Sequence, residues 1–303
     1  VQSAGFMVEP DINLHQTVES PYTVVFDGNG VPVWWYSDGP GGHPMDGKFL
    51  SPSTVAWNEA GTEVIRDLAG NVIQSFTGPD DGLDIHDFIS LPGGNFLGLE
   101  YLHTTCPGPS STCLDLTSWG QGTDVNLTDA KLIEFDATGQ VIWTWSAAEH
   151  IDVVSENANW RSQGRDLIHA NSLAYDGSGG IIMSARHLDA VYRIDMTSGE
   201  ITWKLGGTTT PESLRIKTPF GPYLFSGQHY AEMLPDGTLT LHDNKTSSGQ
   251  PPVAMQFRLN LERRTATLIS SVSDARVQSS ICCGNAYLLP SGNWVADWGA
   301  SHF

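Results

Sequence analysis

Along most of the chain, short runs of β-branched and aromatic residues alternate with polar residues and are separated by turn residues. Alternation with period two in runs of this length is typical of half-buried β-strands. One recurring pattern reads strand, turn, strand, with Asp, Asn or Gly in the turn, where glycine supplies a positive φ. It occurs as TVVFDGNGVPVWW from Thr23, EVIRDLAGNVIQSF from Glu63, KLIEFDATGQVIWTW from Lys131 and VYRIDMTSGEITWKL from Val191.

A second hairpin pattern begins with a polar residue or a histidine and carries a Pro-x-Gly or Asp-Gly turn. It occurs as IHDFISLPGGNFLGLEY from Ile85, IHANSLAYDGSGGIIMSAR from Ile168, QHYAEMLPDGTLTLHDN from Gln228 and GNAYLLPSGNWVADWG from Gly284. The two patterns alternate, which gives four strands per unit, the size of a β-propeller blade. We therefore predict an all-β chain with one β-propeller domain over residues 1–303.

The blade count depends on the two ends of the chain and on one irregular stretch. Five repeats are clear, and a sixth would require a degenerate unit between Gly39 and Ala60 or in the stretch at about 103–129. That stretch lacks alternation, so we expect a loop insertion there. The first hairpin has no partner before it and the last has none after it. We expect the N- and C-terminal strands to complete one blade together and so to close the ring.

Charge narrows the range of partners. The 303 residues are 40% hydrophobic and carry 15 Lys and Arg against 34 Asp and Glu, a formal net charge of -19. Such a surface repels nucleic-acid backbones and anionic lipids, so neither class of partner is expected. No apolar run approaches the roughly 18 residues that a membrane span needs. A small anionic substrate would require local cations, which makes each Arg or His in a position expected to be buried informative.

The four cysteines form two close pairs. Cys106 and Cys113 flank a loop rich in Pro, Gly and Ser, and we predict a disulfide between them. The vicinal pair Cys282 and Cys283 is a second candidate disulfide, with a redox switch or a stiff turn as alternatives that the sequence leaves open.

Several features indicate an extracytoplasmic protein. The sequence starts at Val1 without an initiator methionine, as expected after removal of a signal peptide. Two Asn-x-Thr triplets, at Asn126 and Asn244, predict glycosylation sites. We therefore expect a secreted or extracytoplasmic location.

The histidine positions carry the chemical signal. His86, His169 and His229 each open a hairpin of the second pattern, and the innermost strands of propellers line the central channel, so these rings are expected to converge. Arg186 ends the His169 hairpin, and Asn171 lies on the same strand face as His169. Histidine can act as a nucleophile, an acid or base, or a metal ligand. The nearby arginine favours a bound anion and ranks a metal second.

The motifs around these residues resemble those of the bacterial arylsulfotransferases and their secreted relatives. The resemblance spans most of the chain from about residue 84 onward. It rests on DIHDF at Asp84, IHANS at Ile168, SARH at Ser184, IDMTSGEITWKLGG at Ile194, GQHY at Gly227 and GNAYLLPSGNW at Gly284.

The resemblance implies a six-bladed fold and a reaction without a nucleotide donor or other cofactor. It implies that His229 attacks the sulfur of an aryl sulfate and becomes transiently sulfurylated. By the same resemblance, His169, Asn171 and Arg186 hold the sulfuryl oxygens. His86 would serve as acid to the leaving phenol and as base to the incoming one.

The predicted function is transfer of a sulfuryl group from an aryl sulfate to a phenol. Tyr230, next to His229, is a candidate for contacting the aromatic substrate. Two other functions stay open at this point: a metal-dependent enzyme that uses the three histidines, and a non-catalytic extracellular binding or structural propeller. The sequence leaves the oligomeric state undetermined.

Overall fold

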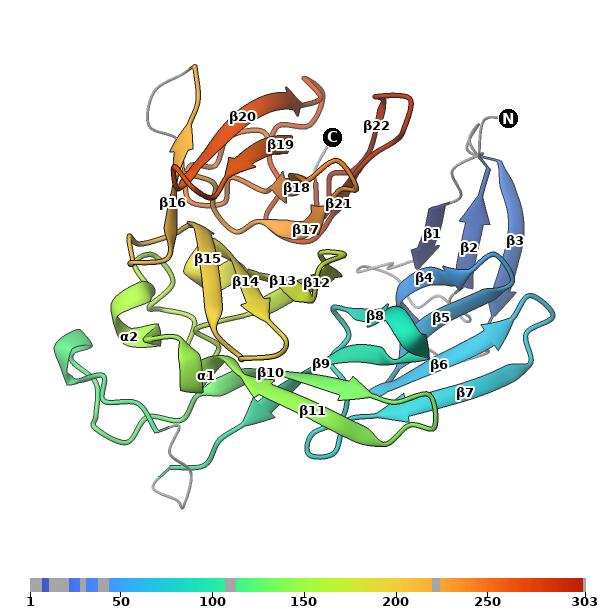
Figure 1. Cartoon of the computed structure of the whole chain (residues 1–303), viewed down its shortest axis with the longest axis horizontal. Coiled ribbons are helices and arrows are strands. Elements are labelled where there is room, and N and C mark those ends of the chain that lie inside the picture. Colours follow the sequence, from blue (N-terminus) through green and yellow to red (C-terminus); the bar gives the residue numbers. More distant parts are fainter. Residues whose placement is uncertain are drawn as a thin grey trace. The chain divides into compact units, whose positions relative to one another are not determined.

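Short β-strands are the main secondary structure of the protein (Figure 1). The computed structural model describes residues 7–10, 22–27, 31–37, 44–106, 113–219 and 224–301. Helices in these ranges are short, namely α1 (Ala147–His150), α2 (Val153–Glu156) and the 3-10 turns η1 (Pro92–Gly94), η2 (Thr117–Trp119) and η3 (Arg186–Leu188). A helix that could cross a bilayer is not found in this part of the chain. The predicted all-β character is confirmed.

The chain divides into two compact units. The first comprises Val1–Tyr101 and Leu132–Thr144, and the second comprises Leu102–Lys131 and Trp145–Phe303. Each unit has its own hydrophobic core. The single propeller over residues 1–303 stays a prediction.

The first unit contains a three-stranded sheet and a four-stranded meander, and it holds most of a second meander. The first sheet is β1 (Met7–Pro10), β2 (Tyr22–Phe26) and β3 (Pro32–Ser37). The first meander is β4 (Met45–Ser51), β5 (Thr54–Glu59), β6 (Thr62–Asp67) and β7 (Val72–Thr77). The other meander is β8 (Phe88–Ser90), β9 (Phe96–His103), β10 (Thr128–Phe135) and β11 (Val141–Ser146).

Aromatic side chains form the core of the first unit. Phe76 lies 4.8 Å from Phe96 and 5.3 Å from both Phe88 and Phe135, measured between ring centroids. The interplanar angles of 41° to 59° are the tilted arrangement that aromatic pairs favour. These contacts join β7 to the strands of the β8–β11 sheet.

A nine-stranded sheet dominates the second unit. Its order is β12-β13-β14-β15-β16-β20-β19-β18-β17, which places two antiparallel meanders on either side of β16. Strand β16 pairs in parallel with both β15 and β20 and so joins the two meanders. A separate hairpin of two strands follows. The bounds are β12 (Ala170–Tyr175), β13 (Gly180–Ala185), β14 (Ala190–Asp195), β15 (Ile201–Gly206), β16 (Ser213–Lys217), β17 (His229–Met233), β18 (Thr238–Asp243), β19 (Val253–Asn260), β20 (Thr265–Val272), β21 (Asn285–Leu288) and β22 (Trp294–Asp297).

The core of the second unit lies between its two meanders. Side chains from β13 to β16 pack against side chains from β17 to β20, and most of them are fully buried. The largest members are Trp203 on β15, Phe257 on β19 and Phe225 in the loop before β17. Because both meanders contribute, neither can bury its apolar face alone, as expected for repeated units that stack.

All eight hairpins predicted from the two sequence patterns are confirmed as adjacent antiparallel strands. The turns follow the expected chemistry. In the first pattern, Asp27, Asp67, Asp136 and Asp195 each accept a hydrogen bond from a backbone N–H two to four residues later. This bond fixes the turn locally, which is why short sequence windows predict it.

Two parts of the chain hold structure that the patterns did not reveal. The stretch between Gly39 and Ala60, named as a place for a degenerate unit, contains the β4–β5 hairpin, and β19–β20 forms a further hairpin. The predicted insertion at about 103–129 lies between β9 and β10, and an isolated bridge pairs Leu114 with Val125 there. The blade count and the closure of the ring by both chain ends stay predictions.

Candidate functional site

Three histidines lie at equivalent places at the starts of strands. His86 lies two residues before β8, His169 immediately precedes β12, and His229 is the first residue of β17. In each case a side-chain oxygen close by bonds to Nδ1 of the ring. Because Nδ1 is occupied in this way, chemistry at these rings has to use Nε2.

Asp84 holds His86 in the first unit. One Asp84 carboxylate oxygen accepts hydrogen bonds from Nδ1 of His86 and, at 3.0 Å, from its backbone N–H. The ring also stacks on Tyr101 with centroids 5.6 Å apart. These contacts fix the orientation of the ring, so proton exchange would use Nε2. The predicted convergence of His86 with the histidines of the second unit stays a prediction.

A second carboxylate holds two imidazole rings in the second unit. His169 Nδ1 lies 2.5 Å from Asp166 Oδ2, and the His169 ring lies 4.5 Å from the His187 ring. His169 has φ of 51°, a left-handed conformation that few non-glycine residues adopt. Such backbone conformations are frequent at functional sites, where the surrounding structure enforces them.

The tautomer of His187 follows from its two partners. Its Nδ1 lies 2.6 Å from the Asp166 carbonyl oxygen, which can only accept, so Nδ1 carries the proton. Its Nε2 lies 2.7 Å from Nη1 of Arg186, which can only donate. Burial, followed by the nearby His169, lowers the pKa of His187 to about 4, so the ring is neutral at physiological pH.

Arg186 is held in one orientation by three contacts. Nη1 donates to His187, Nη2 donates to the Ile281 carbonyl oxygen at 2.8 Å, and the guanidinium lies 4.4 Å above the Trp160 ring. Its Nε is buried and lacks a hydrogen-bond partner among the described residues. Burial lowers the pKa of Arg186, while the nearby carboxylates of Asp189 and Asp166 favour its charged form. A partly desolvated cation with one unused donor is suited to an anion with several oxygens.

His229 is buried and its ring is bonded on both nitrogens. Nε2 accepts the backbone N–H of Cys283 at 3.1 Å, so the proton of the neutral ring resides on Nδ1. Nδ1 donates to Oδ1 of Asn244 at 2.7 Å and lies 3.1 Å from the Gly227 carbonyl oxygen. The ring therefore presents the lone pair of Nε2 to the segment that carries Cys283.

The two predicted substrate-binding residues differ in what they contact. Asn171 is buried, and its amide donates to the Gln228 carbonyl oxygen at 2.8 Å, directly before His229. In this arrangement Asn171 positions the strand that carries His229. Tyr230 has φ of 49°, and its ring lies 4.5 Å from the Tyr287 ring on β21. Binding of a substrate by either residue stays a prediction.

Glycosylation of Asn244 does not fit the structure. The side chain is only 1% exposed, and its amide nitrogen donates to Ser280 Oγ at 2.6 Å and to the Cys283 carbonyl oxygen at 2.9 Å. A buried amide with both hydrogens engaged is closed to a glycosyl donor, so this prediction is corrected. The other predicted site, Asn126, is half-buried and accepts the backbone N–H of Cys106 through Oδ1 at 2.8 Å.

One of the two cysteine pairs forms a disulfide and the other does not. Cys106 and Cys113 form the predicted disulfide. Cys282 and Cys283 are not joined by a disulfide, which corrects that part of the prediction. A hydrogen bond with Cys282, together with burial, raises the pKa of the Cys283 thiol well above its usual range. Cys283 also has φ of 66°, which turns its backbone N–H toward His229.

A metal fits this cluster poorly. Ligand atoms of Asp166, His169 and His187 lie within 4.8 Å of one another, close enough for an ion. However, Nδ1 of His187 bonds to a carbonyl oxygen and Nε2 faces the Arg186 guanidinium. A divalent cation would have to displace one of these partners and would be repelled by the arginine.

Sequence reasoning missed four residues that build this site. Asp166 holds His169, His187 orients Arg186, and Asn244 holds His229. The fourth is Asp189, whose carboxylate accepts from Trp160 Nε1 at 2.9 Å and from the Gly227 backbone N–H at 2.8 Å. The contacts of Asn244 and Asp189 join residues 15 to 38 positions apart, so short sequence windows contain no signal for them. Asp166 lies three residues before His169 and His187 directly follows Arg186, so these two lie within a local window that could have found them.

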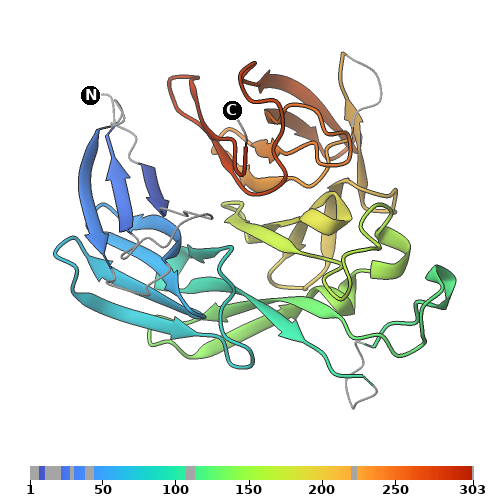
Figure 2. The same ribbon diagram turned by 180° about the vertical axis from the view of Figure 1, so that it is seen from behind.

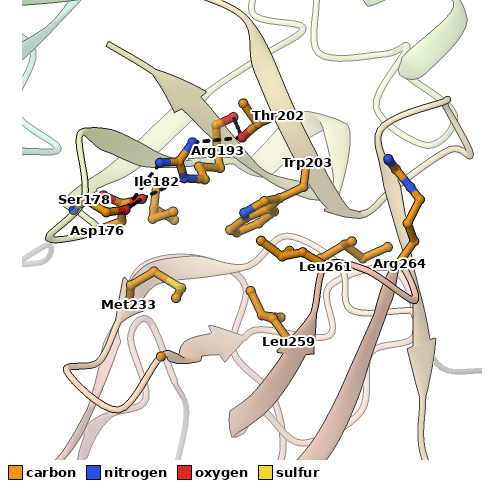
Figure 3. Close-up of a pocket in the computed structure, with 12 residues that line it drawn as sticks. Asp176, Ser178, Ile182, Arg193, Thr202, Trp203, Met233, Leu259, Leu261 and Arg264 are labelled. Carbon is orange, nitrogen blue, oxygen red and sulfur yellow. Dashed lines mark hydrogen bonds and ion pairs between the residues drawn. The ribbon is translucent and has the colours of Figure 1, made fainter. Parts of the chain in front are cut away.

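Two pockets lie elsewhere in the second unit. One of about 570 Å³ lies between the two meanders, with Trp203 and Leu259 among its apolar lining residues (Figure 3). On one wall Arg193 donates to Asp176 at 2.7 Å and to Thr202 at 3.0 Å, and Arg264 also lines the pocket. None of the predicted site residues line it.

The other pocket, of about 480 Å³, adjoins the loops before His229 and after Asn244, where Ser226 and Lys245 line it. The view from behind shows the same strands of the second unit (Figure 2).

Three solved structures match this chain at low sequence identity. A structure from Bacteroides caccae, of a protein of unknown function, matches with a TM-score of 0.52 and 11% identity over 92% of this chain and 76% of that chain. Myxococcus xanthus glutaminyl cyclase matches with a TM-score of 0.40 and 11% identity, over 79% of this chain and 81% of that one. BamB from Moraxella catarrhalis matches with a TM-score of 0.38 and 12% identity, over 93% and 70% respectively.

At such low identity the Bacteroides caccae structure supports the fold alone. A search of the curated proteins gives no significant match. The sequence profile described as Arylsulfotransferase (ASST) matches residues 6–303, which is nearly the whole chain. The protein therefore belongs to the arylsulfotransferase family.

Proposed function

We propose that this protein transfers a sulfuryl group from an aryl sulfate ester to a phenol through a sulfohistidine formed on His229, with no nucleotide donor. The observation that carries the proposal is the network around His229. Nε2 of the ring accepts the backbone N–H of Cys283, so the ring is neutral with its lone pair on Nε2, and Nδ1 donates its proton to Asn244 Oδ1. A neutral imidazole fixed in this tautomer is the form that can act as a nucleophile.

The transfer takes two balanced steps. In the first, Nε2 of His229 attacks sulfur, an N–S bond forms, the S–O bond to the donor phenol breaks, and the phenol oxygen takes a proton. In the second, the acceptor phenol attacks sulfur, the N–S bond breaks, and the acceptor loses its proton. His86, whose ring Asp84 orients through Nδ1, is proposed as the acid in the first step and the base in the second.

Arg186 and the backbone N–H of Cys283 are proposed to bind the sulfuryl oxygens. The segment 281–283 contacts both Arg186 and His229. Arg186 donates to the Ile281 carbonyl oxygen, and the Cys283 backbone N–H donates to Nε2 of His229. When sulfur reaches Nε2, the Cys283 N–H loses its acceptor and can donate to a sulfuryl oxygen instead. Fixed donors aimed at developing negative charge are often the largest single contribution to catalysis.

His169, Asn171 and Tyr230 have supporting roles in this proposal. His169, whose ring Asp166 orients through Nδ1, would donate from Nε2 to a sulfuryl oxygen. Asn171 would keep the strand start at Gln228 in place, and Tyr230 would contact the aromatic ring of the substrate. We also propose an extracytoplasmic location, which the disulfide between Cys106 and Cys113 supports because such bonds persist in oxidising compartments.

The experiment is turnover of a chromogenic aryl sulfate with and without a phenol acceptor. The proposal expects phenol release that increases when the acceptor is added, and a sulfated acceptor in equal amount to the phenol released. His229→Gln should abolish both products while the circular dichroism spectrum stays unchanged. No release from several aryl sulfates by the folded protein would overturn the proposal and favour a non-catalytic binding propeller.

A metal-dependent enzyme is the second candidate, and the close approach of Asp166, His169 and His187 is the observation in its favour. Elemental analysis of the purified protein and turnover after dialysis against a chelator distinguish the two. Activity that survives the chelator in metal-free protein supports the sulfohistidine route. Activity that is lost and then restored by one divalent metal supports the metal enzyme.

A further inference from the structure

We infer that Asn244 is a positioning residue that fixes both the tautomer and the charge of His229. The inference rests on the proposed function of His229 as the nucleophile. Asn244 lies just after β18, is 1% exposed, and uses its whole amide within the site. Its Oδ1 accepts from His229 Nδ1, and its Nδ2 donates to Ser280 Oγ and to the Cys283 carbonyl oxygen.

The amide of Asn244 has only one orientation that satisfies its neighbours. If it were flipped, Oδ1 would face the Cys283 carbonyl oxygen, and two acceptors would meet. At the same time Nδ2 would face the N–H at Nδ1 of His229, and two donors would meet. The Cys283 carbonyl therefore fixes the amide, and the amide fixes the ring. The backbone N–H of the same cysteine bonds to Nε2, so one residue contacts both ends of this chain of bonds.

The partner of Nδ1 separates His229 from the other two histidines. Asp84 and Asp166 place a carboxylate at Nδ1 of His86 and His169, whereas Asn244 places a neutral oxygen at Nδ1 of His229. A carboxylate stabilises an imidazolium, and an amide does so much less. A nucleophile has to be neutral, while a general acid or a donor to sulfuryl oxygens is better charged. Asn244 thus keeps at His229 the protonation state that the reaction needs there.

The loop that carries Asn244 is anchored independently of the histidine. The Asp243 carboxylate accepts the backbone N–H of Ser226 at 3.0 Å and that of Lys245 at 2.8 Å. These bonds tie the end of β18 to the turn that precedes His229. A substitution at Asn244 is therefore expected to change the ring contact more than the course of the loop.

The test compares Asn244→Asp, Asn244→Ala and a matched control, Asn260→Asp. Asn260 is exposed at the end of β19. It lies six residues, or roughly 20 Å along the strand, from Ala254, which pairs with His242 close to the site. Nitrogen NMR of protein labelled at the imidazole rings reports the tautomer and the titration of each histidine. His229→Gln identifies the His229 signals by their loss. The rate of the first step is measured over pH with an aryl sulfate in the same variants.

In the native protein, His229 should be the neutral form with its proton on Nδ1. In Asn244→Asp, the carboxylate should keep the ring protonated to a pH about one unit or more higher. The acid side of the rate profile should move to higher pH by the same amount. In Asn244→Ala, the signals should shift toward a mixture of tautomers, with a loss of about tenfold or more in the first step. Asn260→Asp should match the native protein in every measurement.

Two outcomes overturn the inference. The first is a His229 ring with its proton on Nε2 in the native protein. The second is titration of His229 in Asn244→Asp at the native pH. The NMR readout needs no turnover, so it remains decisive if the protein proves inactive. Absence of sulfuryl transfer with the expected NMR result would count against the proposed function alone.

Discussion

Single side chains in this site act through the geometry of their hydrogen bonds. The guanidinium of Arg186 donates in two directions, toward His187 from Nη1 and toward the Ile281 carbonyl from Nη2. A lysine ammonium is a point charge and cannot reproduce this fork. The orientation of the unused Nε depends on both bonds, so the charge alone is not sufficient for the role that we propose.

Arg186→Lys is predicted to lower kcat/KM for an aryl sulfate by about 100-fold, close to the effect of Arg186→Ala. The control is Arg276→Lys, since Arg276 is exposed and pairs with Asp274. Steady-state kinetics on the three variants make the comparison. A Lys variant with nearly native kcat/KM would show that charge suffices at position 186.

His242 is buried without hydrogen bonds to its ring, and this has a consequence for stability. Its exposure is 0%, neither ring nitrogen has a partner in the described parts of the chain, and burial lowers its pKa to about 4. The unfolded chain has the usual histidine pKa near 6.5, so it binds a proton between pH 6.5 and 4 while the folded protein does not. The stabilising effect of the neutral ring is complete above pH 6.5 and is lost as the pH falls toward 4.

His242→Leu should therefore reduce the acid sensitivity of the protein. The free energy of unfolding of the native protein should fall by about 3 kcal/mol on this account alone when the pH drops below 4. In the variant this contribution should vanish, although the buried His187 should retain a similar one. Denaturant titrations at pH 7, 5.5 and 4.5 measure the slope. Equal slopes in the two proteins would contradict the assignment.

At the residue scale, the sequence predicted side chains that repeat and missed those that support them. The three histidines were visible because each opens a hairpin of the same pattern. Asn244 was taken as a glycosylation site, because an Asn-x-Thr triplet is a local signal and burial is not. In the β17–β18 hairpin His229 pairs with His242, so Asn244 lies near the His229 ring. This pairing could have been predicted from the sequence by counting residues outward from the Asp-Gly turn.

Among the elements, the turn before β17 determines where His229 lies. Gly227 has φ of 63°, and a Cβ atom on it would lie 2.4 Å from Thr246 Oγ1 and 3.0 Å from Thr246 Cβ. Its backbone N–H donates to the Asp189 carboxylate. Glycine is needed here both for the left-handed conformation and for the close approach of the loop that follows Asn244.

Gly227→Ala is predicted to lower the free energy of unfolding by about 1 to 3 kcal/mol and to reduce sulfuryl transfer by tenfold or more. Gly249→Ala is the matched control, because Gly249 has φ of 60° and no atom within 4 Å of its would-be Cβ. Its cost should be limited to the backbone conformation, about 1 kcal/mol, with unchanged turnover. Equal effects of the two variants on turnover would show that the contact with Thr246 is unimportant.

Whether a hairpin could be predicted depended on its turn. The hairpins found in the sequence have Asp, Asn or Gly in the turn, and those residues encode the reversal locally. The β19–β20 turn instead uses Arg264 in a left-handed conformation with φ of 49°, and Asn260 accepts the N–H of Arg263. Charged residues in such a turn give a weak signal. Strand β16 was missed because its parallel pairing with β15 and β20 involves distant residues.

For the whole molecule, repetition predicted the class of fold, and the contacts between meanders lay beyond sequence reasoning. In the second unit, β16 joins two meanders into one sheet, and their apolar faces share one core. The net charge of -19 and the small number of Lys and Arg residues were evident in the sequence, and they drew attention to Arg186 as a candidate anion-binding residue. Its fixation by Ile281, which is 95 residues away, was not evident there.

The central claim is that His229 becomes covalently sulfurylated. The most direct measurement is mass spectrometry of the peptide that contains His229 after rapid mixing with an aryl sulfate in the absence of acceptor, handled at alkaline pH to preserve the N–S bond. The account predicts one sulfuryl adduct on His229 that forms together with phenol release, disappears on addition of a phenol, and is absent in His229→Gln. Phenol release by the native protein with no adduct on His229, or with an adduct on another residue, would contradict it.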